Sequence, residues 1–246
     1  MFQNGDEIVP GQVVGDIAES DMRRIQIRET IISHFQKEAS LFKNGIKTLS
    51  LFFIDEVKKY REYSEDGEEL LGEYGKIFEQ EYMAVLNENL SLFDSDYQKY
   101  LREIDVHNTH CGYFSIDKKT WHSVNSSIAK GNKEGVSDDI SAYNLILKRK
   151  ELLLSFYDEH HRPVPRFIFS HSALREGWDN PNVFQICTLK HSDSTTQKRQ
   201  EVGRGLRLCL NTDGVRMDSD VVGGGTGTGT EQIDCYCQRK LCNFCW

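Results

Sequence analysis

Short apolar runs alternate with amphipathic stretches along most of the chain. Over residues 22–42, apolar side chains recur at spacings that mostly suit one face of a helix. Asn44 and Gly45 follow, and glycine is the usual left-handed residue after a helix. The nearly continuous apolar run over residues 49–54 is typical of a strand that is buried on both faces, as in parallel sheets.

Three further apolar runs, at residues 167–169, 183–189 and 206–210, predict strands of the same kind. Amphipathic helices are predicted within residues 78–93 and over residues 140–157. Residues 107–139 are polar and predict mostly loop. Strands separated by helical or loop crossovers indicate an α/β fold with a largely parallel sheet flanked by helices.

Charge is distributed unevenly along the 246 residues. The net charge of −8 and the pI of about 5.5 argue, taken alone, against a nucleic-acid binder. Residues 55–103 contain fourteen acidic and six basic side chains, an excess that equals the net charge of the whole chain. We interpret this window as a solvated helical insertion, extending over about residues 55–140. Residues 148–207 instead carry eleven basic and seven acidic side chains, so this region is compatible with binding a polyanion.

Targeting signals are missing from the chain as given. It contains no run of 18 apolar residues, and its first twenty residues lack a basic region followed by an apolar one. We therefore expect a cytoplasmic protein that has no membrane partner. Widely spaced single cysteines, such as Cys111 and Cys187, are expected as small buried apolar residues.

Two segments carry the candidate chemistry. Residues 170–183 leave a predicted strand, form a polar loop with Gly177 and Asp179, and enter the next strand. Residues 200–207 then form a Q-x-x-G-R-x-x-R arrangement, in which Arg204 and Arg207 are placed to bind phosphate oxygens.

The two segments resemble motifs V and VI of superfamily 2 helicases, which lie in the second of two RecA-like lobes. Residues 23–31, 45–57, 112–117 and 166–174 resemble the Res subunit of type III restriction-modification enzymes. This resemblance covers about residues 1–220. It implies a RecA-like lobe of an ATP-driven DNA motor that is attached to an endonuclease domain and works with a methyltransferase (Mod) subunit.

The resemblance also implies roles for individual residues. Arg204 and Arg207 are expected to be catalytic arginine fingers that stabilise charge during phosphoryl transfer. The residues expected to shape the ATP-binding cleft are Gly177, Asp179, Gln200 and Gly203. At the end of the strand, Ser170 and Ser172 are expected to contact a DNA phosphate.

The sequence also lacks motifs that the complete enzyme needs. Asp55 and Glu56 follow an apolar strand and mimic a Mg²⁺-binding Walker B site, but no phosphate loop of the form G-x-x-x-x-G-K-[ST] occurs. We therefore assign both carboxylates to a strand end. ATP and Mg²⁺ are expected to be bound mainly by a first lobe that, like the nuclease domain, is missing here.

The predicted organisation is a linker or remnant at residues 1–21, the second lobe at residues 22–218, and a tail at residues 219–246. The tail is expected to be disordered and aberrant, because a Gly/Thr run interrupts the strand–helix pattern. Its cysteines are spaced unusually for zinc, so no metal site is predicted. Two alternatives remain open: a non-catalytic remnant or binding module of a truncated or decayed gene, and another superfamily 2 helicase.

A first prediction follows from the missing phosphate loop. The purified chain should not hydrolyse ATP alone, because arginine fingers act only on a nucleotide that another surface holds. An ATPase assay with and without DNA checks this. A DNA-stimulated activity that Arg204→Ala abolishes would contradict the prediction.

Overall fold

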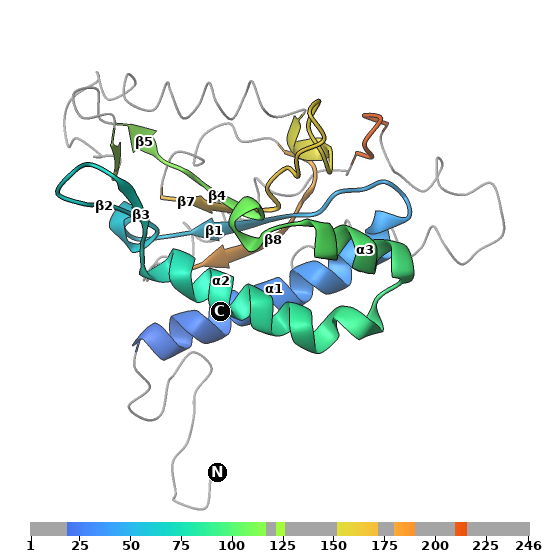
Figure 1. Cartoon of the computed structure of the whole chain (residues 1–246), viewed down its shortest axis with the longest axis horizontal. Helices are drawn as coiled ribbons and strands as arrows, with labels where there is room; N and C mark the ends of the chain where they lie inside the picture. The colour runs from blue at the N-terminus through green and yellow to red at the C-terminus, as the bar shows by residue number, and fades with distance from the viewer. Residues whose placement is uncertain (1–18, 117–121, 126–151, 172–179, 190–209, 216–246) are drawn as a thin grey trace, which may run out of the picture.

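A four-stranded parallel sheet forms the centre of the structure, a computed structural model that describes residues 19–116, 122–125, 152–171, 180–189 and 210–215 (Figure 1). The strands are β1 (Leu49–Phe53), β4 (His110–Tyr113), β7 (Phe167–Ser170) and β8 (Val183–Thr188), in the order β4-β7-β1-β8. Every pair of neighbours is parallel. The predicted α/β class, a parallel sheet flanked by helices as in RecA-like lobes, is confirmed. Within the described residues, no helix is long and apolar enough to cross a membrane.

Both faces of the sheet are buried, which explains the continuous apolar runs. In β1, Leu49, Leu51 and Phe53 join a cluster on one face, whereas Phe52 joins a larger cluster on the other. The larger cluster is strongly aromatic: the ring of Phe52 stacks on that of Phe169 with centroids 4.6 Å apart. Burial on both sides leaves no polar face to produce an alternating pattern.

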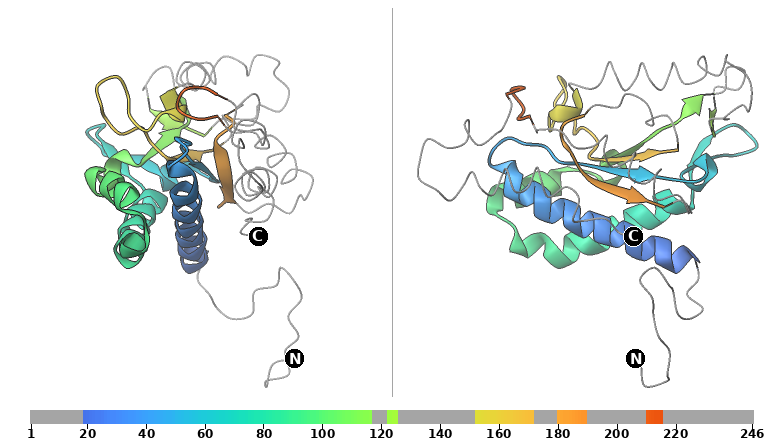
Figure 2. Two further views of the ribbon diagram at one scale, coloured as in Figure 1. Left: turned by 90° about the vertical axis from the view of Figure 1, so that its right-hand side faces the viewer. Right: turned by 180° about the vertical axis from the view of Figure 1, so that it is seen from behind.

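Three helices cover the face that carries the larger cluster: α1 (Glu19–Phe42), α2 (Glu73–Asn89) and α3 (Ser95–Glu103) (Figure 2). As expected, α1 ends before a left-handed glycine, Gly45, whose φ is 66°. The amide of Gly45 donates to the carbonyl of Phe42, and that of Ile46 to the carbonyl of Leu41. These bonds satisfy carbonyls at the helix end and turn the chain into β1.

Smaller elements connect these parts. They are the 3-10 helices η1 (Val57–Lys59), η2 (Leu90–Leu92), η3 (Val106–Asn108) and η4 (Leu152–Leu154), and the short antiparallel pairs β2 (Arg61–Tyr63) with β3 (Glu69–Leu71) and β5 (Ser115–Ile116) with β6 (Ser123–Val124).

The prediction of loop over residues 107–139 is wrong at β4. This strand pairs with β7 and is the edge strand of the described sheet, although it lies inside the range assigned to an insertion. Its sequence, His-Cys-Gly-Tyr, contains no apolar run. Most of the helix predicted at residues 140–157 and the strand predicted at 206–210 lie outside the described residues, as do residues 1–18 and 216–246.

The aromatic cluster yields a stability prediction. Phe167 is fully buried and lies 4.9 Å, centroid to centroid, from Phe78 of α2. Replacing it with alanine should lower the free energy of unfolding by about 3–5 kcal/mol, because it removes a large apolar side chain and leaves a cavity. Urea unfolding of the purified chain measures the loss.

The control is Ile25→Ala on α1, where the isoleucine is 55% exposed and the expected change is close to zero. Equal losses in the two variants would contradict the packing described here.

Candidate functional site

The carboxyl ends of the parallel strands meet at one edge of the sheet, which we call the carboxyl edge (Figure 1). Here β1 leads into Asp55 and Glu56, β7 ends at Ser170, and β8 leads into Leu189. The amide of Leu189 donates to the carbonyl of Phe53 at 2.8 Å, so two of these strand ends are hydrogen-bonded to each other. Ligands of open α/β sheets characteristically bind outside this edge.

Ser170 lies between two other strand ends. It is in register with Phe53 of β1 and with Tyr113 of β4, and its carbonyl accepts from the amide of Ile54 at 2.9 Å. Its side chain is fully buried, and its Oγ has no hydrogen-bond partner within the described part of the chain. A buried hydroxyl without a partner is uncommon and calls for a specific explanation. Its contact with a DNA phosphate stays a prediction.

The two carboxylates that mimic a Walker B site are paired with lysines. Asp55 Oδ2 lies 2.5 Å from Lys59 Nζ, and Glu56 Oε2 lies 2.8 Å from Lys58 Nζ. Partial burial acts to lower the pKa of Lys59, but its hydrogen bonds to Asp55 and Tyr74 outweigh this and raise it. Lys59 is therefore protonated and forms an ion pair with Asp55 at the end of the strand. Within the described ranges, no three His, Cys, Asp or Glu side chains are arranged to hold a metal ion.

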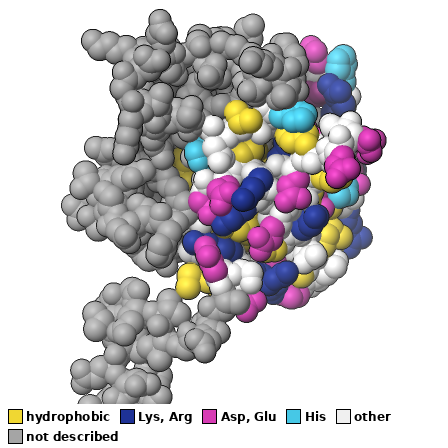
Figure 3. All heavy atoms as spheres, turned by 90° about the vertical axis from the view of Figure 1, so that its left-hand side faces the viewer, with side chains coloured by type: hydrophobic (Ala, Val, Ile, Leu, Met, Phe, Trp, Pro, Cys, Tyr) yellow, Lys and Arg dark blue, Asp and Glu magenta, His cyan; other side chains and the backbone are white. Residues whose placement is uncertain are grey.

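The described surface on this side of the molecule has mixed charge. Figure 3 shows acidic and basic side chains interspersed on the side where β2 and β3 lie. The pairs are local, as for Arg61 and Glu69, whose Nε and Oε1 are 2.8 Å apart. Mixed pairs of this kind create no extended field for a polyanion. The predicted basic character of residues 148–207 rests largely on arginines and lysines outside the described residues.

Most of the predicted site residues also lie outside the described residues: Ser172, Gly177, Asp179, Gln200, Gly203, Arg204 and Arg207. The described residues fix where their segments start. Residues 172–179 follow His171 directly after β7, and residues 190–209 follow Leu189 directly after β8. Both predicted motif segments therefore leave the sheet at the carboxyl edge.

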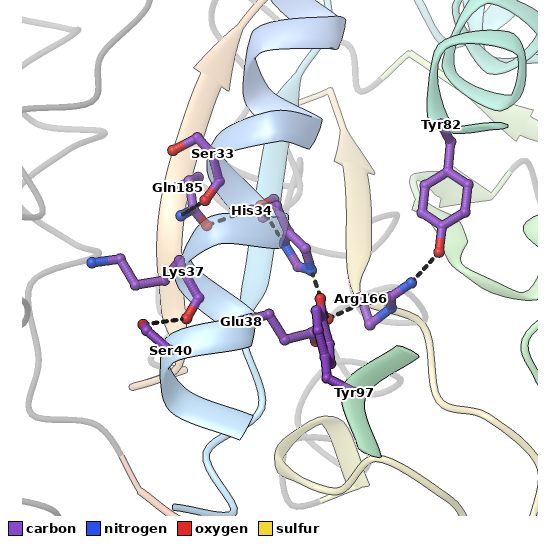
Figure 4. A network of polar contacts seen from close by, with 10 residues as sticks. Ser33, His34, Lys37, Glu38, Ser40, Tyr82, Tyr97, Arg166 and Gln185 are labelled. Atoms are coloured by element: carbon purple, nitrogen blue, oxygen red, sulfur yellow. Dashed lines mark hydrogen bonds and ion pairs between the residues drawn. The ribbon is translucent and has the colours of Figure 1, made fainter. Parts of the chain in front are cut away.

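A buried polar network lies at the opposite edge, where β1 and β7 begin (Figure 4). Glu38 of α1 forms an ion pair with Arg166, the residue before β7, and both side chains are fully buried. Arg166 also donates to the hydroxyl of Tyr82 on α2, and Tyr97 of α3 donates to Glu38 at 2.7 Å. The ring of His34 lies 3.6 Å from Glu38 Oε2 and shares a hydrogen bond with Ser50 of β1.

Electrostatics in this network favour one ionised pair. Burial alone would raise the pKa of Glu38, but the charge of Arg166, together with His34, lowers it to about 2. Burial lowers the pKa of His34 and, much more strongly, that of Lys47, whose Nζ is buried without a hydrogen-bond partner in the described structure. Glu38 and Arg166 are thus charged at neutral pH, and the other basic groups are driven towards their neutral forms.

Sequence reasoning did not single out this network. Glu38 and Arg166 are separated by 128 positions, and neither belongs to a motif. The available signal was local: Glu38 follows His34 by one helical turn on the apolar face of α1, and Arg166 directly precedes a buried strand. A charged residue in such a position needs a buried partner.

Comparison with known proteins adds to this geometry. No protein-family model matches the chain. It is 41% identical over 217 residues, 86% of the chain, to the type III restriction-modification enzyme EcoPI Res subunit of Escherichia phage P1. It is 40% identical to the EcoP15I Res subunit of Escherichia coli, and 35% identical over 246 residues to the StyLTI Res subunit of Salmonella typhimurium. Over most of its own length, the chain matches a segment of type III Res subunits.

The match covers only one part of these proteins. The chain spans about a fifth of the length of each of the three Res subunits. Within this chain, most of the described residues lie in a single α/β unit built on the four-stranded sheet.

The buried ion pair of this Res segment generates a prediction on stability and pH. Glu38→Gln should lower the free energy of unfolding by about 3–5 kcal/mol, because it leaves the charge of Arg166 buried and unpaired. The pKa of Glu38 is lower in the folded chain than its ordinary value of 4.5. Its contribution is therefore complete above pH 4.5 and is lost as the pH falls towards about 2. Urea unfolding of wild type and variant across this range measures both effects.

A matched control is Glu88→Gln, because Glu88 is 55% exposed in its ion pair with Arg28 and should contribute little. The double variant Glu38→Gln/Arg166→Met should be more stable than Glu38→Gln alone, since it removes the unpaired charge. A loss that is independent of pH and unchanged in the double variant would contradict the ionised pair.

Proposed function

We propose that this chain forms the second RecA-like motor lobe of a type III restriction endonuclease. In this role, Arg204 and Arg207 are the arginine fingers that stabilise charge on the phosphoryl group during ATP hydrolysis. Gly177, Asp179, Gln200 and Gly203 shape the same cleft, and Ser170 and Ser172 contact the DNA backbone. Hydrolysis then drives translocation along DNA and cleavage in the complete enzyme.

The observation that carries the proposal is that the two motif segments start at the same edge of the sheet. Both follow strands whose carboxyl ends lie at one edge of a parallel sheet, and the ends of β1 and β8 are joined by the bond from Leu189 to Phe53. The two segments therefore start close together although they are about thirty positions apart in sequence, which is compatible with their residues acting on one ligand. Identity with the Res subunits over both segments supports the assignment.

The described residues fit a lobe that approaches a nucleotide held elsewhere. The two carboxylates at the end of β1 form ion pairs with Lys58 and Lys59, so a Mg²⁺ ion would compete with an ammonium group at each of them. A first lobe would supply the phosphate loop and the Mg²⁺ ligands. ATP bound there would provide the phosphoryl group, and the residues of this chain would orient and stabilise it.

The proposed partners follow from the same role. They are DNA, a first RecA-like lobe, a nuclease domain and a methyltransferase subunit. The expected type of DNA contact is a hydroxyl at a strand end that donates to a phosphate oxygen without reading the base sequence. Because the Oγ of Ser170 is buried in this structure, its contact would require this hydroxyl to become exposed. Recognition of a specific DNA site would then belong to the methyltransferase subunit.

The test uses a chimera in which residues of this chain replace the matching segment of the Escherichia coli EcoP15I Res subunit, supplied with its methyltransferase subunit. Arg204→Ala should reduce the kcat of DNA-dependent ATP hydrolysis by about a thousandfold, because an arginine finger acts mainly on the transition state. Steady-state ATPase assays give kcat and KM for ATP.

The matched control is Arg102→Ala, an exposed arginine on α3 at the end of the helical layer away from the carboxyl edge (Figure 1). It should leave kcat unchanged. An inactive parent chimera that binds DNA and is folded, or an Arg204→Ala variant with full activity, would refute the proposed role.

A further inference from the structure

Asn182, at the start of β8, uses every polar group that it has. Its amide donates to the side chain of Asn180 at 2.9 Å, and its carbonyl accepts from the amide of Leu49 at 2.9 Å. Its side-chain Nδ2 donates to the carbonyl of Leu210 at 2.8 Å, and its Oδ1 accepts from the amide of Leu210 at 2.9 Å. The residue is fully buried.

The side-chain amide thus binds Leu210 as a neighbouring strand would. An Asn side chain offers one acceptor and two donors on a planar group, which matches the amide and carbonyl of one residue. Both of these bonds are buried or partly buried, so losing either one would leave a backbone group unsatisfied at substantial cost.

A second anchor holds the same part of the chain. The amide of Thr212 donates to the carbonyl of Gly45 at 2.9 Å, in the turn that ends α1. Residues 211–215 close into a turn of their own, in which Asn211 Oδ1 accepts from the amides of Asp213 and Val215. Leu210 is therefore fixed to the start of β8, and Thr212 to the end of α1.

These anchors define the end of one of the motif segments. Residues 190–209 start after Leu189, which is bonded to Phe53 at the carboxyl edge, and lead directly into Leu210 at the opposite end of β8. Arg207 precedes Leu210 by only three positions. A change in which residue pairs with Asn182 would shift the register of the chain immediately before it.

We infer that Asn182 is a positioning residue that fixes, through its two bonds to Leu210, the point at which the segment bearing Arg204 and Arg207 returns to the start of β8. The inference rests on the function proposed above for these arginines. It assigns a role in the rate of ATP hydrolysis to a residue at the end of the first motif segment, apart from the residues expected to shape the cleft. The role is indirect, since the described contacts of Asn182 are all with protein groups.

Asn182→Asp tests the inference in the chimera described above. The carboxylate keeps the acceptor for the amide of Leu210 but has no donor for its carbonyl. We expect kcat of DNA-dependent ATP hydrolysis to fall about tenfold, with KM for ATP within about twofold of wild type, because misplaced groups stabilise the transition state poorly. Asn211→Asp is the matched control: it makes the same change one residue from Leu210, keeps both acceptor bonds and should leave kcat unchanged.

The decisive measurement is the double variant with Arg204→Ala. If Asn182 acts through the two arginines, Asn182→Asp causes a smaller further loss of kcat once Arg204 is absent, because only Arg207 is left to be misplaced. An equal loss in both backgrounds, or no loss in either, overturns the inference. Full activity of Arg204→Ala alone refutes the proposed function instead, so the two failures are distinguishable.

Thermal unfolding of each variant shows whether the chimera is folded. If Asn182→Asp does not fold, Asn182→Ser replaces it in the same cycle, because a serine hydroxyl is too short to bridge both groups of Leu210. The same outcomes then support or overturn the role of Asn182.

Discussion

The ion pair between Glu38 and Arg166 is the interaction on which the arrangement of the helices depends. It joins α1 to the start of β7, and its two charges bring in Tyr82 from α2 and Tyr97 from α3. All three helices are therefore connected to the sheet through one buried pair. Removing both charges from water is costly, and the pair is tolerated because each partner has further hydrogen bonds. Its contribution lies as much in fixing which residues meet as in added stability.

The two edges of the sheet carry different kinds of residues and segments. At the edge where the strands begin, Glu38, Arg166 and Asn182 are fully buried and bonded to neighbouring elements. At the carboxyl edge, two predicted motif segments depart from the ends of β7 and β8. In α/β folds, reactive groups usually lie on segments that follow the carboxyl ends of the strands, and the packed sheet positions these segments. Through Leu210, Asn182 would connect the edge where the strands begin to the motif segment that returns to this edge.

The sequence predicted those elements whose pattern of apolar residues is contained within the element itself. The strands β1, β7 and β8 were predictable because burial on both faces makes them continuously apolar, and α1 because its apolar spacing ends at Gly45. β4 was not, since His110 and Gly112 have no strand signal. The ring of His110 shares a hydrogen bond with Tyr60, and the rings of Tyr60 and Phe114 leave no room for a Cβ at Gly112. Asn182 and Arg166 were missed as functional or structural residues because their partners are 28 and 128 positions away. The motif residues were identified from a resemblance in sequence, which does not require any contact in the fold to be known.

The acidic window shows how charge counted along the sequence differs from charge in the fold. Many acidic side chains of this window are exposed, but Glu81 of α2 is largely buried and accepts hydrogen bonds from both Arg24 and Arg28 of α1, at 2.6 and 2.9 Å. The hydrogen bonds from these arginines lower the pKa of Glu81 although its partial burial acts to raise it. Part of the acidic excess therefore serves to pack α2 against α1. The acidic excess of the chain is thus divided between the helices α2 and α3 and residues 55–69, which lead from the carboxyl edge through β2 to β3.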